Sequence, residues 1–140
     1  MSYAKLMDDH AAIAALSADL IRIVDGGGSP DVASVVLGRL AVAIRDHRRA
    51  EDAVLATTLR IAAGDRHAVA AVAAMRDLDG LDEEWTFFLY RWCPAAVTAH
   101  WRAFGTDVRA LMPRIAAELA REGSILYSLA LHYDLLAGAD

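Results

Sequence analysis

The sequence predicts an all-α protein, folded as an antiparallel up-down four-helix bundle with a short extra C-terminal helix. Of the 140 residues, 56% are hydrophobic, and alanine, the best helix former, dominates that fraction. Only three prolines interrupt the chain. Glycine clusters divide it into long segments with apolar residues at helical spacing, and we find no strand-like alternation bounded by hairpin turns.

The first two helices are predicted at 3–24 and 30–62. The run Gly26–Gly28 ends the first, because glycine readily takes the left-handed conformation at a helix C-terminus. Ser29 can cap the second helix, and Pro30 suits the first helical position.

The remaining helices are predicted at 65–78, 82–121 and 125–136. Gly64 opens the third, and residues 79–84 join the third to the fourth. The fourth contains Pro94, Gly105 and Pro113, so we expect it to be kinked or split at one or more of them. Gly123 followed by Ser124 predicts a stop and a fresh cap before the short fifth helix. Four main helices with short connections form one domain over residues 1–140.

Charge and cysteine content argue against several classes of partner. The net charge is −5, and the arginines form no basic stripe, so we expect no nucleic-acid partner. No apolar stretch approaches the roughly 20 residues that cross a bilayer, so we expect no membrane insertion. The single cysteine, Cys93, and the acids near the N-terminus predict a cytoplasmic protein.

Polar residues interrupt the predicted apolar faces. His10 lies in the stripe of the first helix, and His47 and Glu51 share a face of the second because they are four residues apart. His67 opens the third helix, and His100 and Asp107 lie on the fourth. Buried imidazoles and carboxylates are costly unless they are paired or bind a metal, and the cores of helix bundles build metal sites from such side chains. Together these residues predict a metal site of the kind used for iron, manganese or zinc.

The order of these motifs resembles the hemerythrin-like (HHE cation-binding) family. Asp9-His10 resembles the motif of its first helix, and His47-x-x-x-Glu51 closely resembles that of its second. Asp65-Arg66-His67 resembles the start of the third helix, and Leu111-Met112-Pro113 resembles the segment that follows the last ligand pair. The resemblance covers residues 6 to 116.

The resemblance implies a non-haem iron site, either a carboxylate-bridged di-iron centre or a mononuclear one. In this family such sites bind O₂, sense oxygen, NO or redox state, or handle metal, and they imply a binding protein or sensor more than a turnover enzyme. The implied ligands are His10, His47, Glu51, His67, His100 and Asp107. His100 and Asp107 share a face but lie ~10 Å apart along an ideal helix, so both can serve one metal only if the helix is distorted, for example at Gly105.

Two other interpretations remain beside the metal-binding one. A metal-free helical bundle could act as a protein-interaction or regulatory module, with His10, His47 and Glu51 as a hydrogen-bonded polar core. A di-metal oxidase would need an open coordination position and a substrate channel. The aromatic region Trp85–Trp101 predicts either core packing around a kink or a surface for a homodimer or another protein partner.

Overall fold

The computed structural model describes residues 3–61, 64–76 and 80–132, and within those ranges it consists of helices and short turns without a strand. The prediction of an all-α protein is therefore confirmed for this part of the chain. In chain order the elements are α1 (Tyr3–Arg22), the π-helical turn η1 (Ile23–Gly27), α2 (Pro30–Ile61), α3 (Arg66–Arg76), α4 (Gly80–Arg91), α5 (Pro94–Ala99) and α6 (Trp101–His132).

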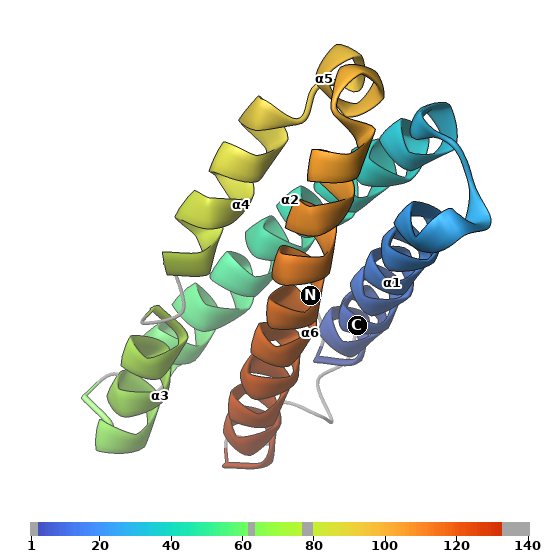
Figure 1. Cartoon of the computed structure of the whole chain (residues 1–140). Coiled ribbons are helices and arrows are strands. Elements are labelled where there is room, and N and C mark those ends of the chain that lie inside the picture. The colour runs from blue at the N-terminus through green and yellow to red at the C-terminus, as the bar shows by residue number, and fades with distance from the viewer. Residues whose placement is uncertain (1–2, 62–63, 77–79, 133–140) are drawn as a thin grey trace.

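The three long helices form the body of the molecule. Helix α1 packs against both α2 and α6, while α3 and α5 each contact α2 and α6 at opposite ends. Figure 1 shows α1 on one side of α6 and α3 and α4 on the other, with α1 running opposite to both α2 and α6. Inward-facing side chains at one level of α1, α2 and α6 can therefore meet in the interior.

The connection between α1 and α2 follows the sequence prediction. Gly26 has φ 116°, the left-handed region that favours glycine. Beside it the Asp25 carboxylate accepts a hydrogen bond from Nε of Arg109 at 2.6 Å, which ties this turn to α6. The Ser29 hydroxyl accepts the backbone N–H of Val32 at 3.4 Å, and α2 begins at Pro30 as predicted. The predicted end of this helix at residue 62 lies outside the described residues.

The fourth predicted helix is split as expected, with α4, α5 and α6 dividing the range 82–121, but its predicted end at residue 121 is wrong because α6 continues to His132. Cys93, the residue before Pro94, is extended at φ −66° and ψ 161°, since the proline ring disfavours a helical conformation there. Pro94 then opens α5, and His100 at φ −129° and ψ 49° separates α5 from α6. The split expected at one of the three breakers therefore occurs at Pro94, whereas Gly105 and Pro113 lie inside α6.

The separate fifth helix predicted over 125–136 is also wrong for its described part, because α6 continues through Gly123 and Ser124 to His132. The Ser124 hydroxyl donates back to the carbonyl of Ala120 at 3.3 Å, so it does not cap a new helix. Gly123 is buried where α6 passes α1, and a Cβ there would lie 3.5 Å from Nδ1 of His10. That distance is an ordinary van der Waals contact, so Gly123 neither ends the helix nor is required by the packing. Residues 133–136 of that prediction, and 77–78 of the third predicted helix, lie outside the described residues.

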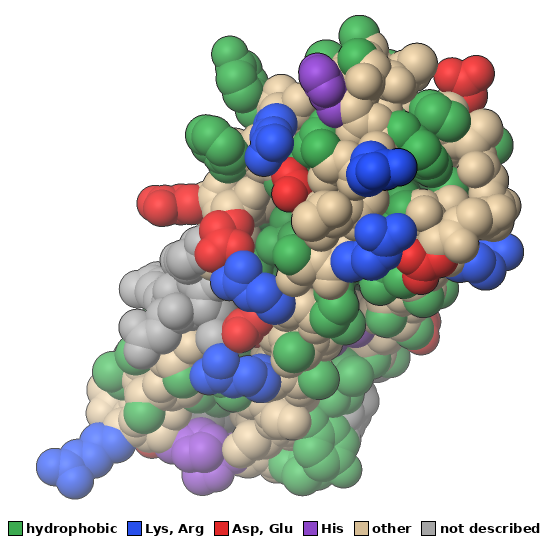
Figure 2. Space-filling view, in the orientation of Figure 1, with side chains coloured by type: hydrophobic (Ala, Val, Ile, Leu, Met, Phe, Trp, Pro, Cys, Tyr) green, Lys and Arg blue, Asp and Glu red, His purple; other side chains and the backbone are tan. Residues whose placement is uncertain are grey.

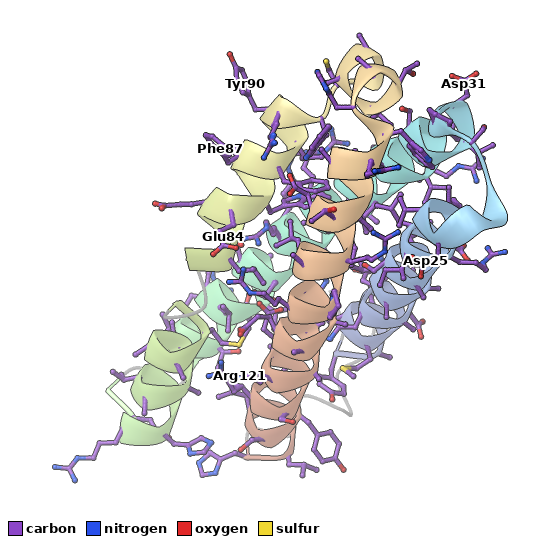
Figure 3. The ribbon with its side chains drawn as sticks, viewed as in Figure 1. Asp25, Asp31, Glu84, Phe87, Tyr90 and Arg121 are labelled. Carbon is purple, nitrogen blue, oxygen red and sulfur yellow. The ribbon has the colours of Figure 1, made fainter. Side chains whose placement is uncertain are left out.

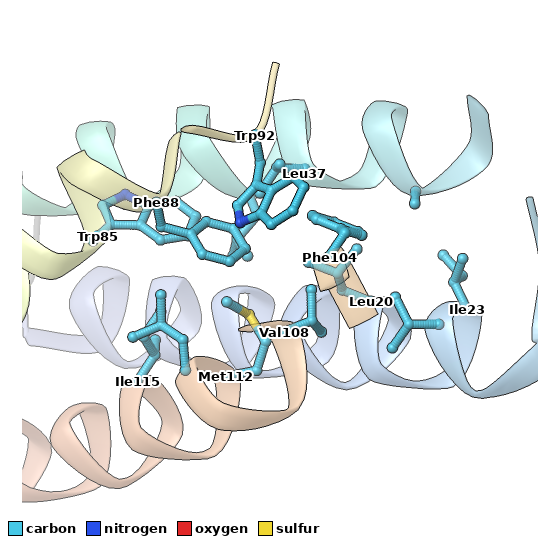
Figure 4. Packing of buried hydrophobic residues seen from close by; sticks show 14 of the residues in the cluster. Leu20, Ile23, Leu37, Trp85, Phe88, Trp92, Phe104, Val108, Met112 and Ile115 are labelled. Carbon is cyan, nitrogen blue, oxygen red and sulfur yellow. The ribbon is translucent and has the colours of Figure 1, made fainter. Parts of the chain in front are cut away.

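Two apolar clusters form the core. The larger surrounds Phe104, which is fully buried and whose ring contacts those of Phe88, Trp92 and Trp101 at centroid distances of 5.2 to 6.0 Å. Figure 4 shows the rings of Phe88, Trp92 and Phe104 packed against aliphatic side chains of α1, α2 and α6. The smaller cluster joins α1, α2, α3 and α6 and consists of Leu6, Ala50, Leu55, Val72, Met75, Leu126 and Leu129.

Candidate metal centre

A polar layer separates the two apolar clusters at the same level of three helices. His10 lies between Leu6 and Ile13 in α1, His47 and Glu51 between Ile44 and Leu55 in α2, and Glu122 between Ile115 and Leu126 in α6. His10 and His47 are only 6% and 3% exposed, and both carboxylates are partly buried. Each polar residue lies three or four positions from a buried apolar residue on the same helix, so it shares the inward face of that helix.

The donor atoms of this layer converge. Nε2 of His47 lies 3.0 Å from Nε2 of His10 and 3.1 Å from Oε2 of Glu51. Nε2 of His10 lies 3.8 Å from Oε2 of Glu122. One donor atom from each of the four residues lies within 4.8 Å of the others, and this is the one such group of histidine, cysteine and acidic residues found in the described part of the chain.

These spacings fit one cation in the middle of the four donors. Imidazole and carboxylate donors lie ~2.1 Å from a bound transition metal, so neighbouring donors are ~3 Å apart in an octahedron and opposite donors ~4.2 Å. The observed spacings of 3.0, 3.1 and 3.8 Å fall in that interval, and the limit of 4.8 Å exceeds it by little. Small side-chain movements would bring all four donor atoms to bonding distance from one cation.

The second ring nitrogen of His47, Nδ1, also has surroundings that suit a metal-binding histidine. Its Nδ1 is buried and has no hydrogen-bond partner, but it lies 3.6 Å from Oδ2 of Asp9. A proton on Nδ1 would point at this carboxylate and leave the Nε2 lone pair facing the cluster. Histidines that bind metals usually have their second nitrogen oriented by a carboxylate in this way. Lys5 holds Asp9 from the outside, with Nζ 2.5 Å from Oδ1.

Burial sets the protonation of the layer. Desolvation, helped by the neighbouring His47 imidazole, lowers the pKa of His10 to about 4, so this imidazole is neutral at pH 7. Desolvation, followed by the charge of Glu51 and a hydrogen bond with it, raises the pKa of Glu122 to about 8. Without a metal, Glu122 therefore holds a proton at neutral pH, in a hydrogen bond with Glu51. A divalent cation would replace that proton and neutralise both charges.

A cavity of about 40 Å³ adjoins the donors and reaches the surface between α2, α4 and α6. Its wall is apolar apart from His47, Arg48, Glu51, Asp82, Glu118 and Glu122. The Arg48 guanidinium forms an ion pair with Asp82, which joins α2 to α4 beside the cavity. This volume is enough for one or two water-sized molecules next to the metal position.

The structure brings together three of the six ligands implied by the family resemblance, namely His10, His47 and Glu51. The other three do not join the cluster. His67 is exposed at the start of α3, where its ring stacks on that of His132 at a centroid distance of 4.3 Å.

The two implied ligands from the fourth predicted helix also lie elsewhere. His100 is exposed at the corner between α5 and α6. Asp107 accepts a hydrogen bond from the Trp92 indole at 3.0 Å and pairs with Arg91 at 3.0 Å, so it fastens the end of α4 to α6. The distortion at Gly105 that would have brought Asp107 to the metal does not occur, because α6 is helical through that residue.

Glu122 takes the place expected for the ligand from the last helix, and the sequence reasoning missed it. Glu118 and Glu122 are four residues apart, the same spacing as His47 and Glu51, and they follow the apolar positions Leu111 and Ile115 on one face. That pattern was visible in the sequence. The predicted helix end at residue 121 concealed it, because Glu122 then fell in the expected connection to a fifth helix.

Comparison of the chain with known protein families, with curated proteins and with solved structures found no match. Among the described residues, no helix is both long enough and apolar enough to cross a bilayer.

Proposed function

We propose that this chain is a divergent hemerythrin-like protein that binds one divalent transition-metal ion through His10, His47, Glu51 and Glu122. The observation that carries the proposal is the convergence of four donor atoms from three helices within 4.8 Å, between two apolar clusters. The arrangement of α1, α2, α6 and the α3–α4 side supports an up-down four-helix bundle of the hemerythrin kind.

Iron is the metal we propose, in a mononuclear site. Two imidazoles and two carboxylates suit iron, manganese or zinc, and the two carboxylates balance the charge of a divalent ion. Within the described ranges four donor atoms converge, and His67, His100 and Asp107 are engaged or exposed elsewhere, which favours one ion over two. Iron would supply redox chemistry at this position.

The chain's own residues define what such a site does. His10 offers a neutral imidazole nitrogen, His47 offers a second ring nitrogen, and Glu51 and Glu122 offer carboxylate oxygens. The small cavity beside the donors has room for a ligand the size of O₂ or NO. We therefore propose a sensing or metal-handling role instead of turnover of an organic substrate.

The experiment is metal analysis of protein expressed in iron-supplemented medium, followed by titration of the metal-free protein with Fe²⁺, Mn²⁺ and Zn²⁺. We expect about one ion per chain. The variants His47→Ala and Glu122→Gln should lose most of it, while His100→Ala, an exposed histidine, should keep it. Metal content unchanged in His47→Ala would refute the assignment.

A second function is favoured by the carboxylate pair. Because Glu122 holds a proton against Glu51 at neutral pH, the layer reaches a stable charge state without a metal. In that case the polar layer would only specify the fold, and the protein would act through its surface as an interaction module. A folded protein that binds none of the three ions would favour this function.

A further inference from the structure

Helix α4 is apolar on two opposite faces. Its inner face buries Trp85 and Phe88 in the core, and Trp92, directly after the helix, is buried as well. On its outer face Phe87 is 69% exposed and Tyr90 is 87% exposed. Figure 3 shows both rings pointing away from the body, and Figure 2 shows hydrophobic side chains projecting at the same edge. Large aromatic side chains exposed side by side are a feature of interaction surfaces.

The charges beside these rings have a self-complementary order. Glu83, Phe87 and Arg91 are spaced by four residues, so they follow one side of α4 with an acid at one end and a base at the other. All three are exposed. If a second α4 lies antiparallel across the first, with the two Phe87 rings at the centre, each Glu83 lies opposite the Arg91 of the other copy.

We propose that this outer face of α4 is the interface of a symmetric homodimer. A two-fold axis through the Phe87 pair repeats every contact twice, which is the geometry of an isologous interface. Phe87 and Tyr90 then cover one another, and two Glu83–Arg91 ion pairs fix the antiparallel register. This inference is independent of the metal site.

The other contacts of Arg91 leave it able to take part. Its Nη1 lies 3.0 Å from Oδ2 of Asp107, and its guanidinium lies 4.8 Å from the centre of the Trp92 ring. These contacts hold the side chain at the edge of the outer face while 54% of it remains exposed. A guanidinium has five N–H donors, so Arg91 can bind Asp107 and the Glu83 of a second copy together.

A groove beside this face extends the surface. It runs between α4 and α6 and is lined by Glu83, Glu84, Phe87, Phe88, Arg91, Asp107, Ala110, Leu111 and Arg114. Aromatic side chains bury ~150–250 Å² each, so Phe87 and Tyr90 of two copies, with this groove, approach the ~1,000 Å² that a specific interface needs. We therefore expect a dimer that dissociates measurably on dilution.

The test is sedimentation velocity of the full chain over a wide concentration series. We expect the dimer fraction to rise with concentration. Phe87→Ser should weaken dimer formation at least ~tenfold, because the two Phe87 rings lie at the centre of the proposed interface. The ring is exposed and absent from the core, so the variant should still fold. Glu83→Arg and Arg91→Glu should each weaken it similarly by placing like charges opposite one another. The double variant carrying both charge changes should restore association to within a few-fold of the original.

Val35→Ser is the matched control, since Val35 is also an exposed apolar residue but lies on α2, and it should leave the dimer unchanged. Thermal melts of each variant verify that Arg91→Glu still folds beside Asp107, and Phe87→Ser tests the surface without that concern. A wild-type chain that is monomeric at every concentration would overturn the proposal. A dimer that persists in Phe87→Ser, or charge variants without rescue in the double variant, would also overturn it.

Discussion

Glu122→Gln should make the metal-free protein less sensitive to alkaline pH. The folded protein holds the Glu122 proton with a pKa of about 8, against an ordinary value of 4.5. A raised pKa contributes stability that is fully present below pH 4.5 and is lost as pH rises through about 8. Glutamine carries no titrating proton, so this loss should disappear from the variant.

His10 affects the pH dependence of stability in the opposite direction, and its pKa sets the pH range in which the effect of Glu122 can be measured. Its pKa falls from 6.5 to about 4, so its contribution to stability is present above pH 6.5 and is lost as pH falls through about 4. Between pH 4.5 and 6.5 the two effects oppose one another. Between pH 6.5 and 8 the effect of Glu122 remains alone, and about 1.5 pH units at ~1.36 kcal/mol each give a loss of roughly 2 kcal/mol.

Urea unfolding with a chelator present, at pH 6.5 and pH 8, measures this difference. We expect the free energy of unfolding of the wild type to fall by roughly 2 kcal/mol between the two values, and that of Glu122→Gln to change little. Asp31→Asn, at an exposed position outside the polar layer and the proposed dimer interface, is the control and should show the same pH dependence as the wild type. An equal pH dependence in wild type and Glu122→Gln would refute the reasoning that Glu122 is protonated against Glu51 in the folded core.

Three further predictions concern the support of the site and the fold. Asp9→Asn should weaken metal binding ~10–100-fold in titration calorimetry because His47 loses the carboxylate beside Nδ1, and unchanged affinity would exclude that orienting role. Phe104→Ala should lower the free energy of unfolding by ~3–5 kcal/mol in urea, since the ring is fully buried, and a loss below ~1 kcal/mol would contradict that packing. Gly26→Ala should destabilise by ~1 kcal/mol or more in thermal melts from backbone strain alone, because φ is 116° and nothing lies within 4 Å of the added methyl, and an unchanged melt would argue against this conformation.

Local patterns in the sequence predicted the parts of the structure that depend on neighbouring residues. The α1–α2 connection follows from Gly26, Ser29 and Pro30, whose conformational preferences act within a few residues. The break before Pro94 was among the three breaks considered, but Gly105 and Pro113 carried the same local signal and did not break α6. Packing against α1 and the aromatic core stabilises α6 through those positions.

In the candidate site, too, some residues follow from local sequence patterns and others depend on tertiary packing. The sequence by itself determined the helical content and the pairing of His47 with Glu51, because residues four apart on a helix share a face whatever surrounds them. It also placed His10 on an apolar stripe. Only the tertiary structure decided which acid of α6 reaches those three residues. The register of α6 against α1 and α2 is set by burial of Phe104 and its neighbours, and that register brings Glu122 to the polar layer while Asp107 stays with Trp92.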